Sequence, residues 1–121
     1  MTSNAPQEPR DPSDLLPLTP AIFHILLALS GGECHGYGIM LEVQKITGGQ
    51  LQLGPGTLYR SIQRMLIDGL IKETTDAEPG EQEDERRRNY RLTEFGLEVV
   101  RAEVMRLKLL VDEARRRGLL G

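Results

Sequence analysis

The chain has 121 residues, of which 39% are hydrophobic and 27% are charged, so it fits one small folded domain and excludes a large enzyme fold. With two Phe, three Tyr and no Trp, its core must be aliphatic, which favours packed helices over a β-sandwich. The longest apolar run is too short to span a bilayer, one Cys excludes an internal disulfide, and the N-terminus lacks a signal-peptide pattern. We therefore expect a cytoplasmic protein with no membrane partner.

The formal net charge of -3 conceals a division along the chain. Residues 1–85 hold 5 of the 15 basic and 13 of the 18 acidic groups, net -8, whereas residues 86–121 hold 10 and 5, net +5. Because the basic charge is concentrated, the sum does not exclude a nucleic-acid partner.

Two short helices are expected after an N-terminal tail. Residues 1–14 are rich in Pro, Asp, Ser and Asn without apolar periodicity, so we predict that they are disordered. Thr19 followed by Pro20 indicates the N-cap of an apolar helix that ends at a Ser-Gly-Gly run. Apolar residues at helical spacing indicate a second helix over residues 36–47.

A third helix, residues 55–68, is predicted to have two faces. A step of about 100° per residue places its aliphatic side chains together and leaves hydrogen-bonding side chains opposite. Arg bonds two acceptors of guanine, and Ser or Thr reaches a base or a phosphate, so this polar face suits a DNA major groove. An ordinary solvated face is the alternative. The expected DNA contacts on this helix are Thr57, Arg60, Ser61 and Arg64.

A hairpin with a long loop is predicted next. Residues 70–75 and 87–92 alternate like strands on either side of an acidic loop, residues 76–85. Three helices followed by a hairpin is the order of a winged helix-turn-helix, whose wing touches the DNA backbone. Arginines on the return strand suit phosphates, and neutralisation of the acidic loop is the alternative. These expected phosphate contacts are Arg86, Arg87, Arg88 and Arg91.

The longest predicted helix is the last, with Thr93 as its N-cap and Arg115 to Arg117 at the end that favours cations. Apolar residues at alternating spacings of three and four form a seam of the coiled-coil type. A small domain covers only part of such a stripe, so we expect this helix to form a two-fold homodimer. The alternative is that it folds back as core of its own domain. The seam consists of Leu97, Val100, Val104, Leu107, Val111 and Ala114.

These elements predict a mainly α fold with a small β-hairpin. The expected parts are the disordered tail 1–14, a winged helix-turn-helix domain over 15–92 and a C-terminal dimerisation helix over 93–121. Catalytic and cofactor-binding motifs are missing, and Cys34 with its neighbour His35 falls short of the ligands that a zinc site needs, so we expect no enzyme, no cofactor and no metal. Cys34 is either a redox-sensing thiol at a helix start or inert.

Five short motifs follow one another along the chain. At residues 18–20, 35–39, 54–60, 69–71 and 88–96 they read Leu-Thr-Pro, His-Gly-Tyr-Gly-Ile, Gly-Pro-Gly-Thr-Leu-Tyr-Arg, Gly-Leu-Ile and Arg-Asn-Tyr-Arg-Leu-Thr-Glu-Phe-Gly. In these motifs the chain resembles the PadR family of bacterial transcriptional regulators over residues 15–117. The single helix after the wing resembles the short subfamily.

The resemblance implies a homodimeric repressor that binds double-stranded DNA at a palindromic operator. It also implies that Tyr37 and Tyr59 lie near the DNA, and packing at the helix junction is their alternative role. Such regulators often respond to a small aromatic or lipophilic effector, which Leu, Val and Met side chains with Phe23 or Phe95 would enclose here. A small-molecule-binding or protein-interaction module on a winged-helix fold is the alternative function.

Overall fold

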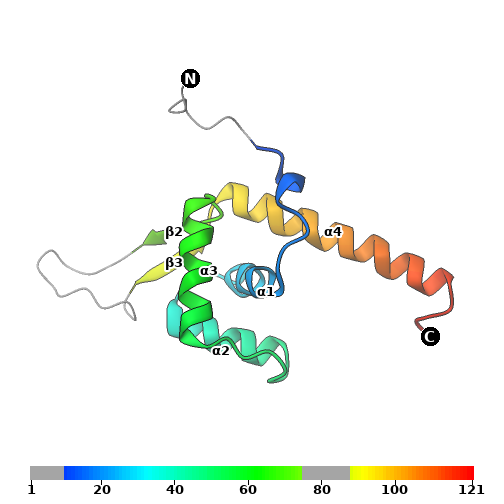
Figure 1. The fold of residues 1–121 in the computed structure, drawn as a ribbon, viewed down its shortest axis with the longest axis horizontal. Helices are drawn as coiled ribbons and strands as arrows, with labels where there is room; N and C mark the ends of the chain where they lie inside the picture. The colour runs from blue at the N-terminus through cyan, green and yellow to red at the C-terminus, as the bar shows by residue number, and fades with distance from the viewer. Residues whose placement is uncertain (1–9, 75–87) are drawn as a thin grey trace, which may run out of the picture.

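A computed structural model describes residues 10–74 and 88–121 of the protein. Helices form most of it, and a small antiparallel sheet lies at one side, which confirms the predicted fold class (Figure 1). The elements in chain order are η1 (Pro12–Leu15), α1 (Pro20–Leu29), β1 (Cys34–His35), α2 (Gly36–Ile46), α3 (Pro55–Ile67), β2 (Ile71–Thr74), β3 (Asn89–Leu92) and α4 (Glu94–Arg116).

The sheet has the strand order β1-β3-β2, and both neighbouring pairs are antiparallel. β2 and β3 form the predicted hairpin, with Ile71 opposite Leu92. β1 was not predicted, because two residues are too few to show an alternating pattern. Its pairing of Cys34 with Tyr90 joins the start of α2 to the hairpin.

An aliphatic core lies between α1, α2, α3, the first turns of α4 and the sheet, as the composition predicts. Ile25, Leu26, Ile39 and Leu58 are completely buried. Burial of side chains of this size stabilises a fold by roughly 1.5–3 kcal/mol each. The further buried apolar residues of this core are Ala28, Leu29, Val43, Leu53, Ile62, Met65, Leu70, Ile71, Tyr90, Val99 and Val100.

Both threonine caps predicted from the sequence are confirmed. The Thr19 hydroxyl accepts a hydrogen bond from the Ile22 amide at 3.2 Å and so begins α1. The Thr93 hydroxyl accepts from the Gly96 amide at 2.9 Å and so begins α4. It also donates to the Gly69 carbonyl at 2.6 Å, which ties the start of α4 to the end of α3.

Two glycines make this junction compact. Gly69 ends α3 with φ of +77°, a backbone conformation that residues other than glycine rarely adopt. Gly96 lies directly against Leu70, where a Cβ would collide with the Leu70 carbonyl oxygen and lie 2.9 Å from its carbon. The first turns of α4 are therefore packed onto the domain.

For residues 10–14, the structure corrects the prediction of a disordered tail. η1 lies partly within this segment, and the Asp11 carboxylate accepts from the Ser13 amide at 3.0 Å and from its hydroxyl at 2.9 Å. η1 contacts α4, which supplies the order that composition alone does not indicate. Residues 1–9 lie outside the described part of the chain.

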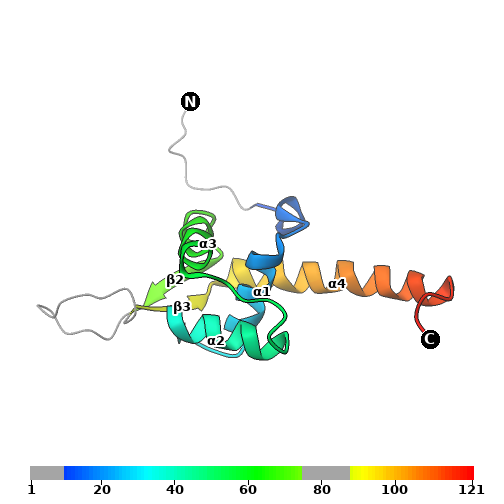
Figure 2. The same cartoon turned by 60° about the horizontal axis from the view of Figure 1, so that its bottom comes forward.

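α4 extends well past the other elements (Figures 1 and 2). Its N-terminal half packs beside η1, α1 and β3, and its C-terminal half projects away from the domain. The domain therefore presents two surfaces with few tertiary contacts, the outer side of α3 and the second half of α4.

Candidate nucleic-acid interface

α3 exposes one polar face and buries the other, as the 100° step predicts. Thr57, Arg60 and Arg64 are exposed, and Ser61 is half-buried at the edge of this face. Spacings of three and four residues align these side chains in one stripe. Their donors are the types that bind base edges and phosphates. The buried side consists of Leu58, Ile62 and Met65.

The first turn of α3 is open to solvent. Gly54 is its N-cap and provides no side-chain hydrogen bond, and Pro55 occupies the first turn. A Cβ at Gly54 or Gly56 would meet no atom within 4 Å. Free amides at a helix N-terminus favour anions, so a phosphate group can approach this turn closely.

Arg60 and Arg64 differ in their partners. Arg64 Nε donates to the Asp68 carboxylate at 3.2 Å, within the same helix. Among residues 10–74 and 88–121, Arg60 makes no hydrogen bond or ion pair. Arg60 is therefore ready to bind an acceptor, whereas Arg64 must exchange its bond to Asp68 for one.

The two predicted tyrosines occupy different environments. Tyr59 is half-buried on α3, and its hydroxyl oxygen lies 2.5 Å from the position of a Cβ on Gly36. This contact favours its alternative role in packing α3 on the start of α2. Tyr37 is 51% exposed near the start of α2, where its phenol is free to reach a phosphate.

Ile67 is a surface residue that the sequence analysis missed. Its side chain is 74% exposed at the end of α3, one turn after Gln63 and Arg64 on the polar side. An apolar group at such a position suits contact with a thymine methyl. The sequence could have indicated this position, because Ile67 is an isoleucine that falls outside the aliphatic stripe of α3.

The wing is the hairpin formed by β2 and β3, and its strand register places two cationic side chains opposite one another. Lys72 of β2 lies directly opposite Arg91 of β3, and both are exposed. Like charges directly opposite in an antiparallel pair repel one another. A phosphate beside them would relieve this repulsion, so the pair suits contact with a nucleic-acid backbone.

The wing arginines predicted from the sequence are only partly described. Arg88 lies half-buried with its Nε 3.5 Å from the carboxylate of Glu73, which precedes the acidic loop, so this contact does not test the alternative that the arginines neutralise that loop. Arg86 and Arg87 lie outside the described residues, as does the acidic loop 76–85.

The predicted seam of α4 divides into a buried and an exposed part. Val100 is 4% exposed in the core of its own domain, which corrects its assignment to a dimer interface, and Leu97 is half-buried against that core. Farther along, Val104 and Val111 are 47% and 44% exposed. The remaining seam residues, both half-buried, are Leu107 and Ala114.

The second half of α4 is apolar beyond the seam. Met105, Leu109 and Leu110 are exposed on other sides of the helix. An exposed helix with apolar residues on several sides is unusual in a monomer, because such helices are normally buried. This half of α4 is therefore a surface suited to a partner.

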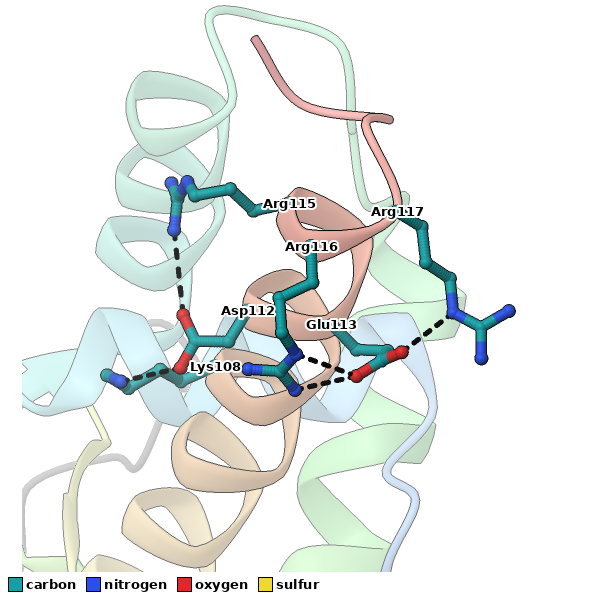
Figure 3. A network of polar contacts seen from close by, with 6 residues as sticks. All are labelled: Lys108, Asp112, Glu113, Arg115, Arg116 and Arg117. Carbon is teal, nitrogen blue, oxygen red and sulfur yellow. Dashed lines mark hydrogen bonds and ion pairs between the residues drawn. The ribbon is translucent and has the colours of Figure 1, made fainter.

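Ion pairs within the last turns of α4 engage its cluster of basic side chains (Figure 3). Asp112 contacts Lys108 at 2.8 Å and Arg115 at 3.6 Å, and the hydrogen bond from Lys108 lowers the pKa of Asp112. Because these cations already have carboxylate partners, the end of α4 is a weaker candidate for phosphate contact than α3 or the wing. The second group consists of Glu113 with Arg116 at 2.6 Å and Arg117 at 2.7 Å.

The surroundings of Cys34 and His35 indicate structural roles for both residues. Burial, together with the nearby charge of Glu42, raises the pKa of the Cys34 thiol, so its position does not favour the reactive thiolate. The His35 ring accepts from the Gly38 amide at 3.0 Å and caps α2. In the described ranges, no three His, Cys, Asp or Glu side chains are close enough to hold a metal ion, and no helix is long and apolar enough to cross a membrane.

Sequence comparisons identify relatives of this chain. The sequence profile of the transcriptional regulator PadR-like family matches residues 25–102. A curated relative from Streptomyces fradiae, the uncharacterized 37.1 kDa protein in transposon TN4556, is 32% identical over 79 residues, which are 65% of this chain. The chain spans only 20% of the length of that protein.

Several solved structures share the fold. A PadR family transcription regulator from Clostridium difficile R20291 has a TM-score of 0.66 at 23% identity, with 81% of this chain and 97% of that one covered. A transcriptional regulator from Clostridium thermocellum has a TM-score of 0.64 at 24% identity, with coverages of 79% and 87%. Bacillus subtilis PadR in complex with operator DNA has a TM-score of 0.58 at 22% identity, with coverages of 69% and 46%.

Proposed function

Because this chain belongs to the PadR-like family of transcriptional regulators, we propose that it is a homodimeric repressor that reads a palindromic operator with α3 and the wing. Members of this family are transcriptional regulators and not enzymes. The observation that carries the proposal is the exposed polar stripe of α3, formed by Thr57, Arg60 and Arg64.

The proposed binding mode places α3 in a major groove. Arg60, which has no partner among the described residues, is the side chain assigned to a guanine, and Thr57 and the open first turn are assigned to the flanking phosphates. Lys72 and Arg91 of the wing add backbone contacts. Base contacts then give specificity and phosphate contacts give orientation.

Support for this mode also comes from a relative. The Bacillus subtilis PadR structure contains operator DNA, and this chain is similar to that protein in fold. The exposed polar face of α3 in this chain is the reason to expect that it also binds DNA.

A second copy is the proposed partner of α4. The apolar side chains of its second half, Val104, Met105, Leu109, Leu110 and Val111, would be covered in a two-fold dimer. Two reading helices related by a two-fold axis match half-sites about one DNA turn apart, which is why the operator is proposed to be palindromic.

We further propose that the protein represses transcription and that a small lipophilic effector relieves this repression. A groove of about 460 Å³ beside α4 is large enough for a small ligand. Phe23 and Phe95, which the sequence analysis expected beside an effector, do not line this groove. Its lining residues are Ser13, Leu16, Pro17, Ala102, Met105, Arg106 and Leu109.

Selection from a random duplex pool tests the proposed function, because it finds the operator sequence by binding alone. The protein should enrich a palindromic sequence, and fluorescence anisotropy should then show binding on the order of 10³-fold tighter than to a scrambled duplex, weakening with salt. Enrichment of no sequence would contradict it and would favour the alternative of a small-molecule or protein-interaction module.

Variants of α3 locate the binding surface. Arg60→Ala should weaken binding to the selected duplex by roughly 10- to 100-fold, the discrimination of one good arginine contact to a base. Arg101→Ala removes an exposed arginine from α4 and serves as the matched control, with affinity unchanged. Equal affinity of Arg60→Ala and the wild type would remove α3 from the proposed interface.

A further inference from the structure

The segment before α1 connects the end of α3 with the middle of α4. Residues 10–18, here called the brace, contain η1 and run beside the first half of α4 (Figures 1 and 2). The brace has one polar attachment at each end and apolar contacts between them. Each attachment joins residues far apart in the sequence.

The first attachment is Arg10. Its guanidinium donates a hydrogen bond to the backbone carbonyl of Asp68, at the C-cap of α3, 58 residues away. The same group lies 4.9 Å from the centroid of the Phe95 ring, in the first turn of α4. A cation at the C-terminal end of a helix also interacts favourably with the helix dipole. Arg10 thus contacts both the C-terminal end of α3 and the first turn of α4.

The second attachment is a buried carboxylate. Glu103 of α4 is 2% exposed and accepts from the Leu18 amide at 3.1 Å. Arg106 donates to the two oxygens of this carboxylate at 2.6 Å and 3.0 Å. A buried carboxylate is tolerated when its hydrogen bonds are made, and here one of them fixes the brace to α4.

The middle of the brace is also ordered. Leu15 and Leu16 pack against the hydrophobic core, and the Asp11 carboxylate holds η1 through Ser13. Both ends are therefore connected through a folded segment and not through a loose chain.

The attachment at Asp68 is linked to the DNA-facing side of α3. The Asp68 carboxylate accepts from Arg64, one turn earlier on the polar stripe. Its backbone carbonyl accepts from Arg10. Asp68 therefore binds both Arg64, a side chain of the polar face of α3, and Arg10 of the brace.

We propose that the brace sets the orientation of α3 relative to α4, and that Arg10 is a positioning residue for DNA reading. This inference rests on the proposed function of α3. In a two-fold dimer, a change in the angle between α3 and α4 moves both reading helices relative to their half-sites. Arg10 acts on affinity through Asp68 and Phe95 and not by touching the DNA.

Amide exchange measured by NMR on the DNA-free protein tests the brace directly. Arg10→Ala should accelerate exchange of the Asp68, Gly69 and Leu70 amides, which close the end of α3. Amides within α2 should not change. Asp14→Ala, which alters an exposed η1 side chain without removing an attachment, is the control. Unchanged exchange at the end of α3 in Arg10→Ala would overturn the inference whether or not the protein binds DNA.

DNA binding separates positioning from direct contact. Arg10→Ala should weaken binding to the selected duplex on the order of fivefold, within the usual range of coupling between sites. The slope of affinity against salt should stay at its wild-type value, and Arg10→Lys should restore part of the affinity. A slope reduced by about 0.9 would make Arg10 a phosphate contact and overturn the positioning role. Failure of the wild type to select any duplex would instead reject the proposed function, while the exchange measurement still decides the brace.

Discussion

The two halves of α4 carry the same apolar spacing and yet lie in different surroundings. In the first half, Gly96, Val99 and Val100 are buried against the domain, and Glu103 is buried beneath the brace. In the second half, apolar side chains such as Met105 and Leu109 are exposed. The first half is therefore part of the fold, whereas the second half needs a partner to cover its apolar surface.

This difference separates stability from assembly. A change in the first half disturbs contacts that the single chain already makes. A change in the second half leaves those contacts in place and acts on the proposed interface with a second copy. Substitutions in each half can therefore test whether folding stability and dimer formation depend on different parts of α4.

Substitution of Gly96 should have the largest effect on the fold. In Gly96→Ala the new Cβ meets the backbone of Leu70, which has little freedom to move, so we expect a loss of about 3 kcal/mol in the free energy of unfolding. Urea denaturation followed by circular dichroism measures it. Gly56→Ala on α3 is the control, because its Cβ meets nothing within 4 Å and should cause no loss. Equal stability of the two variants would show that α4 is not tightly packed on the domain.

Charges on the second half of α4 should dissociate the dimer without unfolding the domain. In the double variant Val104→Glu with Val111→Glu, two carboxylates enter the proposed interface, and we expect the dimer to weaken at least on the order of 100-fold. Sedimentation equilibrium measures the change, and circular dichroism should show the helices intact. Gln50→Glu adds one such carboxylate to an exposed site outside α4 and should stay dimeric. A dimer of unchanged strength in the double variant would place the interface elsewhere.

The buried carboxylate of the first half gives a pH dependence. The hydrogen bond from Arg106 holds the pKa of Glu103 below its ordinary value of 4.5, so its stabilisation is complete above that value and is lost as the pH falls through the lowered pKa. Glu103→Gln should therefore cost about 2 kcal/mol at pH 7, and the difference from the wild type should shrink below pH 4.5. Urea midpoints at several pH values measure this. A difference that stays constant with pH would contradict the assigned role of the charge.

The ion pairs at the end of α4 should matter least. Asp112→Asn removes the partner of Lys108 and Arg115 at a solvent-accessible site, where such pairs contribute little. We expect no resolvable change in melting temperature or in dimer mass. A marked loss of dimer would show that this network belongs to the interface.

Sequence reasoning succeeded where the geometry of a single element decides the outcome. The two faces of α3 follow from a step of 100° per residue, and the Thr19 and Thr93 caps follow from local hydrogen bonding. The wing hairpin likewise lies within the two segments predicted as strands, residues 70–75 and 87–92.

Features that depend on contacts between distant segments could not be predicted from the sequence. The place along α4 where the domain ends sets the division of the seam, and no periodicity marks it. The pairing of Lys72 with Arg91 needs the strand register, and the bond from Arg10 to Asp68 spans 58 residues. The roles of Arg86 and Arg87 stay predictions, because both lie outside the described residues.

Native mass spectrometry of the protein on its selected duplex measures assembly and DNA binding in one experiment. We expect two chains per palindromic duplex, and loss of this complex in the double variant of Val104 and Val111. One chain per duplex at saturating protein would contradict the proposed two-fold dimer, and no complex with any selected duplex would contradict DNA reading by α3.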